Sequence, residues 1–231
     1  MVNGGQWGPC DFDTDDRRQN VAVFAVTAVL FDCDGVLVDS LGAAAVAWNA
    51  WAVTWKPGFD FHRDVEHGRR LSDYVLELVG PDDAAQATAE LVALERRHAV
   101  DVRAIPGAAQ LVAGLPDGSW AVVTSGTRDI AVARLTAAGI PDPAVLVTAE
   151  DVTAGKPEPD PYLTAAARLN RAPAECAVFE DAPAGILAAQ RAGIATVIGV
   201  GVDAAVPGVS ATVPDLRHIA FDGVELWISD R

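Results

Sequence analysis

Lysine is almost absent from this chain of 231 residues, which has 15 arginines but only two lysines, Lys56 and Lys156. Acidic residues outnumber basic ones by 32 to 17, which gives a formal net charge of −15 and a sequence pI near 4.5. Nucleic acids and anionic membrane surfaces require a basic face, so neither is expected as a partner. The same negative field attracts divalent cations and repels anions, so any phosphate site must supply its own local positive charge.

Cysteine and long apolar runs are also scarce. The three cysteines show neither Cys-x-x-Cys nor zinc-site spacing, which predicts a reduced, cytoplasmic chain; they are Cys10, Cys33 and Cys176. The apolar run at residues 21–31 is too short to span a bilayer and ends in Asp32. No basic region precedes this run, so the pattern argues against a signal peptide.

The most informative stretch is the apolar run Ala28–Phe31, which leads directly into Asp32 and Asp34. It predicts a buried parallel strand, and open α/β sheets place their chemistry at the carboxyl ends of such strands. Aspartate is costly to bury unless it is paired, so the two carboxylates need a cation or hydrogen-bond donors. Alternation directs both carboxylates to one side and Cys33 to the other. No glycine fingerprint follows this strand, which excludes dinucleotide binding.

The rest of the chain predicts an α/β fold: a doubly wound (Rossmann-like) parallel sheet core with an inserted small all-helical cap domain. We expect a poorly ordered N-terminal tail at 1–26, a core at 27–40 and 104–231, and the cap at 41–103. Residues 21–26 would either lengthen the first strand or pack beside it. Strands alternate with helices in the core at 120–124, 145–148, 177–179 and 195–198, with a short edge strand at 212–213. Residues 216–228 receive no assignment.

The predicted cap contains only helical patterns. An alanine-rich helix over 41–53 carries tryptophans at three- and four-residue steps, and a second long helix covers 83–100. These tryptophans are Trp48, Trp51 and Trp55. A stripe at this spacing indicates side-chain packing in preference to ligand binding.

Polar residues stand at four connections of the predicted sheet: Asp32-Cys33-Asp34-Gly35, Thr124-Ser125-Gly126-Thr127-Arg128, Gly155-Lys156-Pro157 and Glu180-Asp181. Because the carboxyl ends of parallel strands share one edge of the sheet, these residues should converge. Carboxylates without histidine or cysteine select a hard cation, Mg²⁺ above all, and hydroxyls with glycine before a helix form a phosphate cradle. Together they predict phosphoryl chemistry.

Each connection has a structural alternative when it is taken alone. The hydroxyls at 124–128 could simply cap the following helix, and Lys156 could be a solvated loop residue. Helix capping would also explain Asp181. It does not explain why Glu180 follows the same buried strand.

The ordered set Asp32-x-Asp34-Gly-Val, Thr124, Lys156-Pro and Glu180-Asp181 resembles the haloacid dehalogenase superfamily of phosphohydrolases over residues 27 to 213. Together with the cap element His67-Gly-x-Arg70, these motifs look most like the sugar and polyol phosphatases of the 2-deoxyglucose-6-phosphatase and glycerol-phosphatase group. The resemblance implies a Mg²⁺-dependent phosphatase that hydrolyses a small phosphorylated sugar or polyol through an aspartyl-phosphate.

The resemblance also implies roles for individual residues. Asp32 would be the nucleophile and Asp34 the general acid and base. Mg²⁺ would be held by Asp32, the backbone carbonyl of Asp34, and Asp181, with Glu180 directly or through water. Thr124 and Lys156 would bind the transferring phosphoryl oxygens, with help from the backbone N–H groups of Ser125 and Gly126. The candidates for further substrate contacts are His67, Arg69, Arg70 and Arg128.

Three rival functions are weighed against this one. A sugar phosphomutase would share the nucleophile and the metal, but the related mutases usually carry a histidine ten residues after the second aspartate, where this chain has Ala44. A haloacid dehalogenase normally lacks the second acid and the metal pair, so Asp34 and Asp181 argue against it. A non-catalytic phosphosugar-binding module would keep the pocket without turnover, although every expected catalytic position is filled. The oligomeric state is open.

Overall fold

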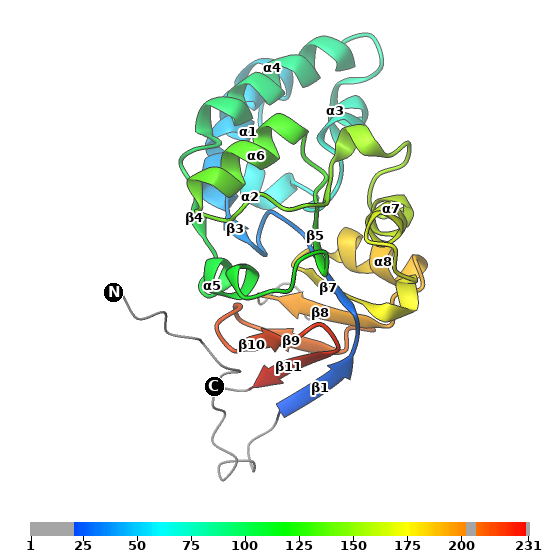
Figure 1. Ribbon diagram of the computed structural model, residues 1–231. Coiled ribbons are helices and arrows are strands. Elements are labelled where there is room, and N and C mark those ends of the chain that lie inside the picture. The colour runs from blue at the N-terminus through cyan, green and yellow to red at the C-terminus, as the bar shows by residue number, and fades with distance from the viewer. Residues whose placement is uncertain (1–20, 202–206, 230–231) are drawn as a thin grey trace, which may run out of the picture.

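The computed structural model describes residues 21–201 and 207–229. Its centre is a six-stranded sheet in which all neighbouring strands run parallel. In spatial order the strands are β6 (Leu146–Val147), β5 (Trp120–Val123), β2 (Ala28–Phe31), β7 (Cys176–Glu180), β8 (Thr196–Val200) and β9 (Ala211–Val213). The earliest of these strands, β2, therefore lies in the interior of the sheet, as in doubly wound folds (Figure 1). The predicted α/β fold class is confirmed.

Helices cover both faces of this sheet. Helices α7 (Asp160–Arg168) and α8 (Pro183–Arg191) pack on the face that carries Ala28 and Leu30. Helices α5 (Ala108–Ala113) and α6 (Arg128–Ala137) pack on the face that carries Val29 and Phe31. All four β2 side chains are fully buried, because alternation gives each face of the strand two apolar residues. Short 3₁₀ turns, η1 (Ala149–Asp151) and η2 (Pro173–Glu175), complete the connections.

A second, antiparallel sheet extends the core on the face of α5. It has the order β1-β11-β10, with β1 at Val21–Ala25, β10 at Ile219–Phe221 and β11 at Glu225–Ser229. The structure thus corrects the expected tail, because residues 21–25 pair with β11 along their whole length and do not lengthen β2. Residues 1–20, including Cys10, lie outside the described residues. The unassigned stretch 216–228 provides the partner strands, and buried Leu226 and Ile228 join the same core cluster as Phe31.

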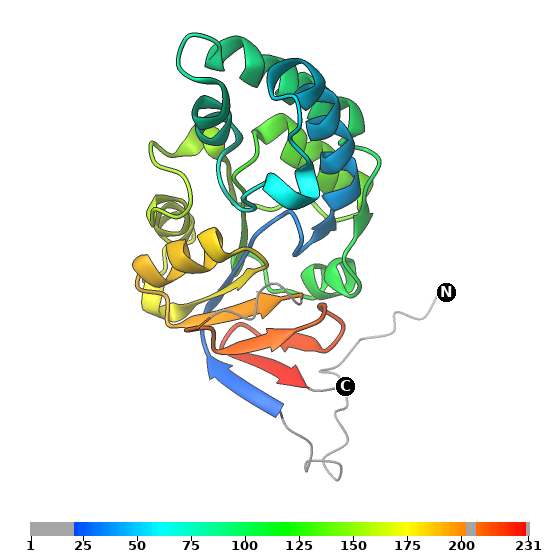
Figure 2. The same cartoon turned by 180° about the vertical axis from the view of Figure 1, so that it is seen from behind.

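The helical insertion begins and ends at a two-stranded ribbon, in which β3 (Val38–Asp39) pairs antiparallel with β4 (Arg103–Ala104). Its helices are α1 (Leu41–Trp55), α2 (Phe61–Asp64), α3 (Leu71–Val79) and α4 (Ala84–His98). They gather at the end of the molecule opposite the antiparallel sheet (Figure 2). Among the described residues, no helix combines the length and the apolar character needed to cross a bilayer.

The tryptophans of α1 pack within the insertion. Trp51 is 1% exposed and donates a hydrogen bond from its indole N–H to the Ala87 carbonyl at 2.9 Å. Trp55 donates to Glu90 Oε2 at 2.7 Å. Both contacts join α1 to α4, so the packing interpretation of the stripe is confirmed for these residues. Trp48 is buried as well, but it also forms part of a cavity wall.

Candidate active site

Three neighbouring parallel strands direct polar residues to one edge of the sheet. Asp32 follows β2, Thr124 follows β5, and Glu180 ends β7. Because β2 pairs with both β5 and β7, these side chains lie side by side at the carboxyl ends of the strands. The sequence expectation of convergence is met for all three.

Lys156 reaches the centre of this edge from the loop before α7. Its Nζ donates to Asp32 Oδ1 at 2.5 Å, to Glu180 Oε1 at 2.5 Å and to the Val123 carbonyl at 3.1 Å. Its side chain is fully buried, so the solvated-loop interpretation is wrong. Burial lowers the pKa of Lys156, but the two facing carboxylates outweigh it and hold this pKa above its ordinary value. The lysine therefore carries a fixed positive charge beside Asp32.

Three carboxylates at this edge form a candidate cation site. Asp32, Glu180 and Asp181 each offer an oxygen atom within 4.8 Å of the others. Burial raises the pKa of both Asp32 and Asp181, and repulsion among the neighbouring carboxylates adds to this effect. Within the described part of the chain, no hydrogen-bond donor reaches the Asp181 carboxylate. A hard divalent cation would relieve this repulsion, so the donor set fits one.

The surroundings of the site distinguish the roles of the three acids. Glu180 Oε1 accepts from Lys156 and from the Tyr162 hydroxyl at 2.7 Å. Its Oε2 accepts the backbone N–H groups of Asp181 and Ala182 at 3.1 and 3.2 Å. Both Glu180 oxygens thus already have protein donors, which leaves Asp32 and Asp181 as the acids best able to bind a cation directly.

Gly35 allows the close approach on which this arrangement depends. A Cβ atom at this position would lie 2.0 Å from Asp181 Oδ2, and the backbone has a φ of +83°. Any other L-residue would therefore both strain the backbone and displace the Asp181 carboxylate.

Asp34 points to a different set of partners. Its Oδ1 accepts from the Ser40 hydroxyl at 2.6 Å and from Arg134 Nη1 at 2.9 Å. The Asp34 side chain is 33% exposed and lines a cavity of about 500 Å³ that lies between the sheet edge and the insertion. Arg134 was not among the sequence candidates. It lies 100 residues from Asp34 on an ordinary helix, so no local pattern could reveal it.

The predicted phosphate cradle is only partly open. Thr124 Oγ1 accepts the Gly126 N–H at 3.0 Å, so that N–H already has a partner. The Ser125 hydroxyl donates to the Gly68 carbonyl at 2.7 Å, which ties the insertion to the core. The Thr124 hydroxyl proton remains available to a phosphoryl oxygen, since its oxygen serves here as an acceptor.

The insertion residues named from sequence all line the cavity, and each of them already contacts other protein groups. Arg69 pairs with Glu66 at 2.9 Å and with Glu77. Arg70 donates to the carbonyls of residues 153 and 152 at 3.1 and 3.0 Å, across to the core. The His67 ring stands edge-on to Phe61, with centroids 5.4 Å apart. Their direct role toward substrate stays a prediction.

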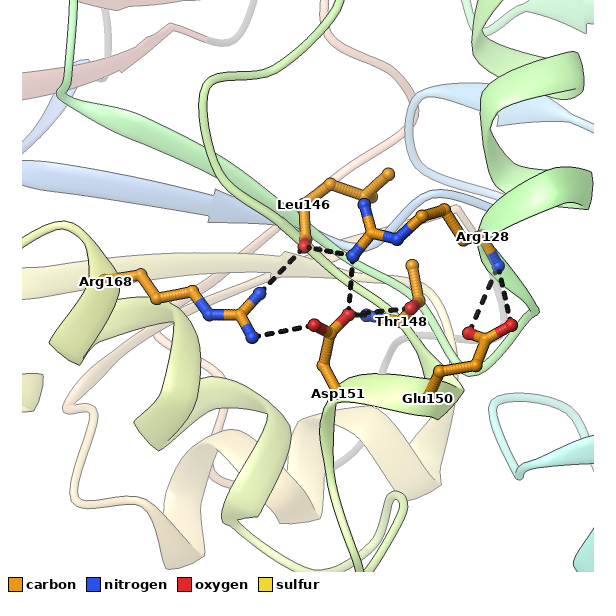
Figure 3. A network of polar contacts seen from close by, with 6 residues as sticks. All are labelled: Arg128, Leu146, Thr148, Glu150, Asp151 and Arg168. Carbon is orange, nitrogen blue, oxygen red and sulfur yellow. Dashed lines mark hydrogen bonds and ion pairs between the residues drawn. The ribbon is translucent and has the colours of Figure 1, made fainter.

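Arg128 is not brought to the cavity. Its guanidinium donates to Asp151 Oδ2 at 2.8 Å and to the Leu146 carbonyl at 3.2 Å (Figure 3). Arg168 meets the other Asp151 oxygen at 2.7 Å, so one carboxylate joins two arginines. Sequence reasoning offered Arg128 as a phosphate contact; the structure corrects this, because Asp151 draws the side chain to the β6 edge of the sheet.

Comparisons with known proteins agree with this geometry. The family model described as haloacid dehalogenase-like hydrolase matches residues 26–193. Hexitol phosphatase A of Escherichia coli strain K12 is 43% identical over 172 residues, covering 71% of this chain and 78% of that protein. Glycerol-1-phosphate phosphohydrolase 2 of Saccharomyces cerevisiae is 36% identical over 222 residues, covering 89% and 82%.

A solved structure agrees as well. The crystal structure of a hydrolase from Pseudomonas syringae superimposes with a TM-score of 0.68 at 26% identity, covering 82% of this chain and 94% of that one. Sequence and fold thus give the same assignment, and the chain belongs to the haloacid dehalogenase-like hydrolases.

Proposed function

We propose that this protein is a Mg²⁺-dependent phosphatase that hydrolyses a small phosphorylated sugar or polyol through an aspartyl-phosphate on Asp32. One observation carries the proposal: the buried Lys156 meets three carboxylates, and two of these, Asp32 and Asp181, line one cavity together with Thr124 and Asp34. The names of the similar phosphatases from E. coli and yeast favour sugars or polyols as the substrate class. A cavity of about 500 Å³ suits a metabolite of that size.

The first half-reaction uses Asp32 and Asp34. The Asp32 carboxylate attacks phosphorus as the bond to the sugar oxygen breaks, and Lys156 holds that carboxylate in position through Oδ1. Protonated Asp34 gives its proton to the departing alkoxide. Bound by Asp32, Asp181 and the Asp34 backbone carbonyl, Mg²⁺ would supply positive charge to the phosphoryl oxygens.

The second half-reaction reverses the role of Asp34. Its carboxylate now accepts a proton from water, which attacks phosphorus and releases inorganic phosphate from Asp32. Thr124 donates to the phosphoryl group in both steps, and the positive charge of Lys156, held beside Asp32, favours the charge that gathers on the phosphoryl oxygens. The insertion acts as the cap, and its residues 41–103 select the alcohol portion of the substrate.

Phosphate release tests this proposal directly. Sugar, polyol and nucleotide monophosphates are incubated with the protein and Mg²⁺, with and without EDTA. We expect release from one or more polyol or sugar phosphates, and a loss of at least about 10²-fold with EDTA that added Mg²⁺ restores. Undiminished turnover in EDTA contradicts the metal requirement. Binding without turnover favours a binding module, whereas a new sugar phosphate without free phosphate favours a mutase.

The charge of the cavity wall predicts discrimination among phosphates. Among the described residues, six carboxylates line it, against three arginines. The acids are Asp32, Asp34, Asp39, Glu66, Glu95 and Asp181, and the arginines are Arg69, Arg70 and Arg134. A second anionic group on the substrate would meet this excess of negative charge, and the net charge of −15 adds to the repulsion.

Glycerol 3-phosphate and 3-phosphoglycerate give a matched comparison, since a carboxylate in the second replaces a hydroxymethyl group. We expect kcat/KM for the phosphoglycerate to be at least about tenfold lower, and the gap to narrow as salt rises. The measurement is phosphate release at two ionic strengths. Equal values of kcat/KM for the two compounds would contradict the proposed repulsion between the cavity carboxylates and a second anionic group.

A further inference from the structure

A chain of buried polar contacts links the insertion to Asp34. Arg134 on α6 donates from Nη1 to Asp34 Oδ1 at 2.9 Å and from Nη2 to Glu95 Oε2 at 3.1 Å. Glu95 lies on α4 of the insertion, and its other oxygen accepts the Trp48 indole N–H at 2.9 Å. Arg134 and Glu95 side chains are 5% and 9% exposed. One guanidinium therefore joins an insertion carboxylate to the carboxylate that would transfer the proton.

This arrangement fixes the direction of the guanidinium. Arginine presents its donors in a rigid plane, so a partner on Nη2 also orients Nη1. A buried charge is stable only while its partners are present, and Arg134 has one partner from each side of the cavity. If α4 moved away from α6, Arg134 would lose Glu95, and the geometry of its bond to Asp34 would no longer be fixed.

We propose that Arg134 is a positioning residue for the Asp34 carboxylate, and that Glu95 makes this positioning depend on the docking of α4 against α6. The inference rests on the proposed function, in which Asp34 transfers the proton. Its consequence is that efficient protonation of the leaving group requires a docked insertion. Proton transfer is thereby confined to the state in which the cavity is covered.

A second ion pair at the same interface serves as an internal control. Arg96 on α4 pairs with Asp129 on α6, and their side chains are 59% and 67% exposed. Neither residue lines the cavity. Both pairs bridge the same two helices, but only the Arg134 pair contacts Asp34. If the Arg134–Glu95 pair only held the two helices together, substitutions in either pair should have the same effect on catalysis.

The test measures kcat/KM against the pKa of the leaving group. This parameter reports phosphoryl transfer to the enzyme, a step in which alkyl phosphates need an acid far more than 4-nitrophenyl phosphate does. The variants are Arg134→Gln, Arg134→Lys and Glu95→Gln, with Arg96→Gln as the control. Wild type shows how kcat/KM depends on the pKa of the leaving group when the general acid is present, and Asp34→Asn shows this dependence when the acid is absent.

We expect Arg134→Gln to lower kcat/KM at least about tenfold for an alkyl phosphate, and less than about threefold for 4-nitrophenyl phosphate. Glu95→Gln should also lower kcat/KM more for the alkyl phosphate than for 4-nitrophenyl phosphate, but by a smaller factor than Arg134→Gln. Arg134→Lys should recover part of the loss, because the positive charge is retained. Arg96→Gln should match the wild-type dependence on the leaving group.

A uniform loss across all leaving groups in the Arg134 variants overturns the positioning role, as does an equal change in Arg96→Gln. The test does not depend on the folding of Arg134→Gln, because Arg134→Lys and Glu95→Gln are conservative; an unchanged dependence in both also overturns the inference. A wild-type protein that releases no phosphate contradicts the proposed function itself, a failure distinct from these.

Discussion

Replacement of Asp32 with asparagine is expected to reduce phosphate release at least about 10⁴-fold. Among the described residues, no other nucleophile occupies the position from which Asp32 would attack phosphorus. Asparagine preserves the shape of the side chain but replaces the nucleophilic oxygen with an amide nitrogen and removes the negative charge. Lys156 donates to Asp32 Oδ1 at 2.5 Å, and the amide oxygen of the asparagine in the variant can still accept this bond. The variant should therefore fold and still bind substrate.

A direct assay of the intermediate accompanies this measurement. Wild-type protein quenched in acid during turnover should carry one phosphoryl group on the peptide that contains Asp32, and Asp32→Asn should carry none. Asp32→Ala is the companion variant, since asparagine can revert to aspartate by deamidation. Residual phosphorylation of either variant at another residue would show that the nucleophile has been misassigned.

The second large effect is expected at Lys156, where methionine should lower kcat about 10³-fold. The side chain is fully buried and lies between Asp32 and Glu180, so it supplies positive charge where the phosphoryl oxygens would gather charge. Its removal also leaves two buried carboxylates facing each other. We expect a loss of about 3 kcal/mol in the free energy of unfolding as a result.

The chain offers a matched control for this variant. Lys56, the only other lysine, is exposed on the insertion and donates to the Leu78 carbonyl at 3.2 Å. Lys56→Met changes the net charge of the protein by the same amount as Lys156→Met. We expect neither the activity nor the stability of Lys56→Met to change appreciably. Activity is compared at temperatures where circular dichroism shows each variant to be folded. If both lysine variants lose activity equally, the position of Lys156 is irrelevant and only the net charge matters.

The sequence by itself was most informative where a residue type is unfavourable for the local structure in which it stands. Asp32 and Glu180 are acids placed at the ends of buried strands, a placement that neither strand propensity nor helix capping explains. The period of the apolar residues identified the parallel sheet and the helical insertion, because burial on two faces of a strand or one face of a helix leaves a local signal. Lys156 was distinctive since the chain otherwise uses arginine for positive charge.

The sequence was least informative about partners distant in the chain. The sequence predicts residues 21–26 as the end of a tail that lengthens the first strand or packs beside it, because no local pattern points to the distant partner strand β11. By its position in the sequence, Arg128 is a candidate either for a phosphate contact or for a solvated residue at the helix start, whereas in the structure Asp151 and Leu146 bind its guanidinium. No pattern in the sequence points to Arg134 as a partner of Asp34. In each case the deciding contact is made across the tertiary structure.

The sequence therefore determined the family and the fold class. It also predicted the core acids of the site, because they directly follow or end buried strands, and the lysine, because the chain has only two. The tertiary structure alone decided how their charges are balanced. It set Glu180 against Lys156 and Tyr162, left Asp181 facing Asp32, and joined Asp34 through Arg134 to Glu95. Such pairings depend on distances between helices and strands far apart in the chain, and no spacing within the sequence encodes those distances.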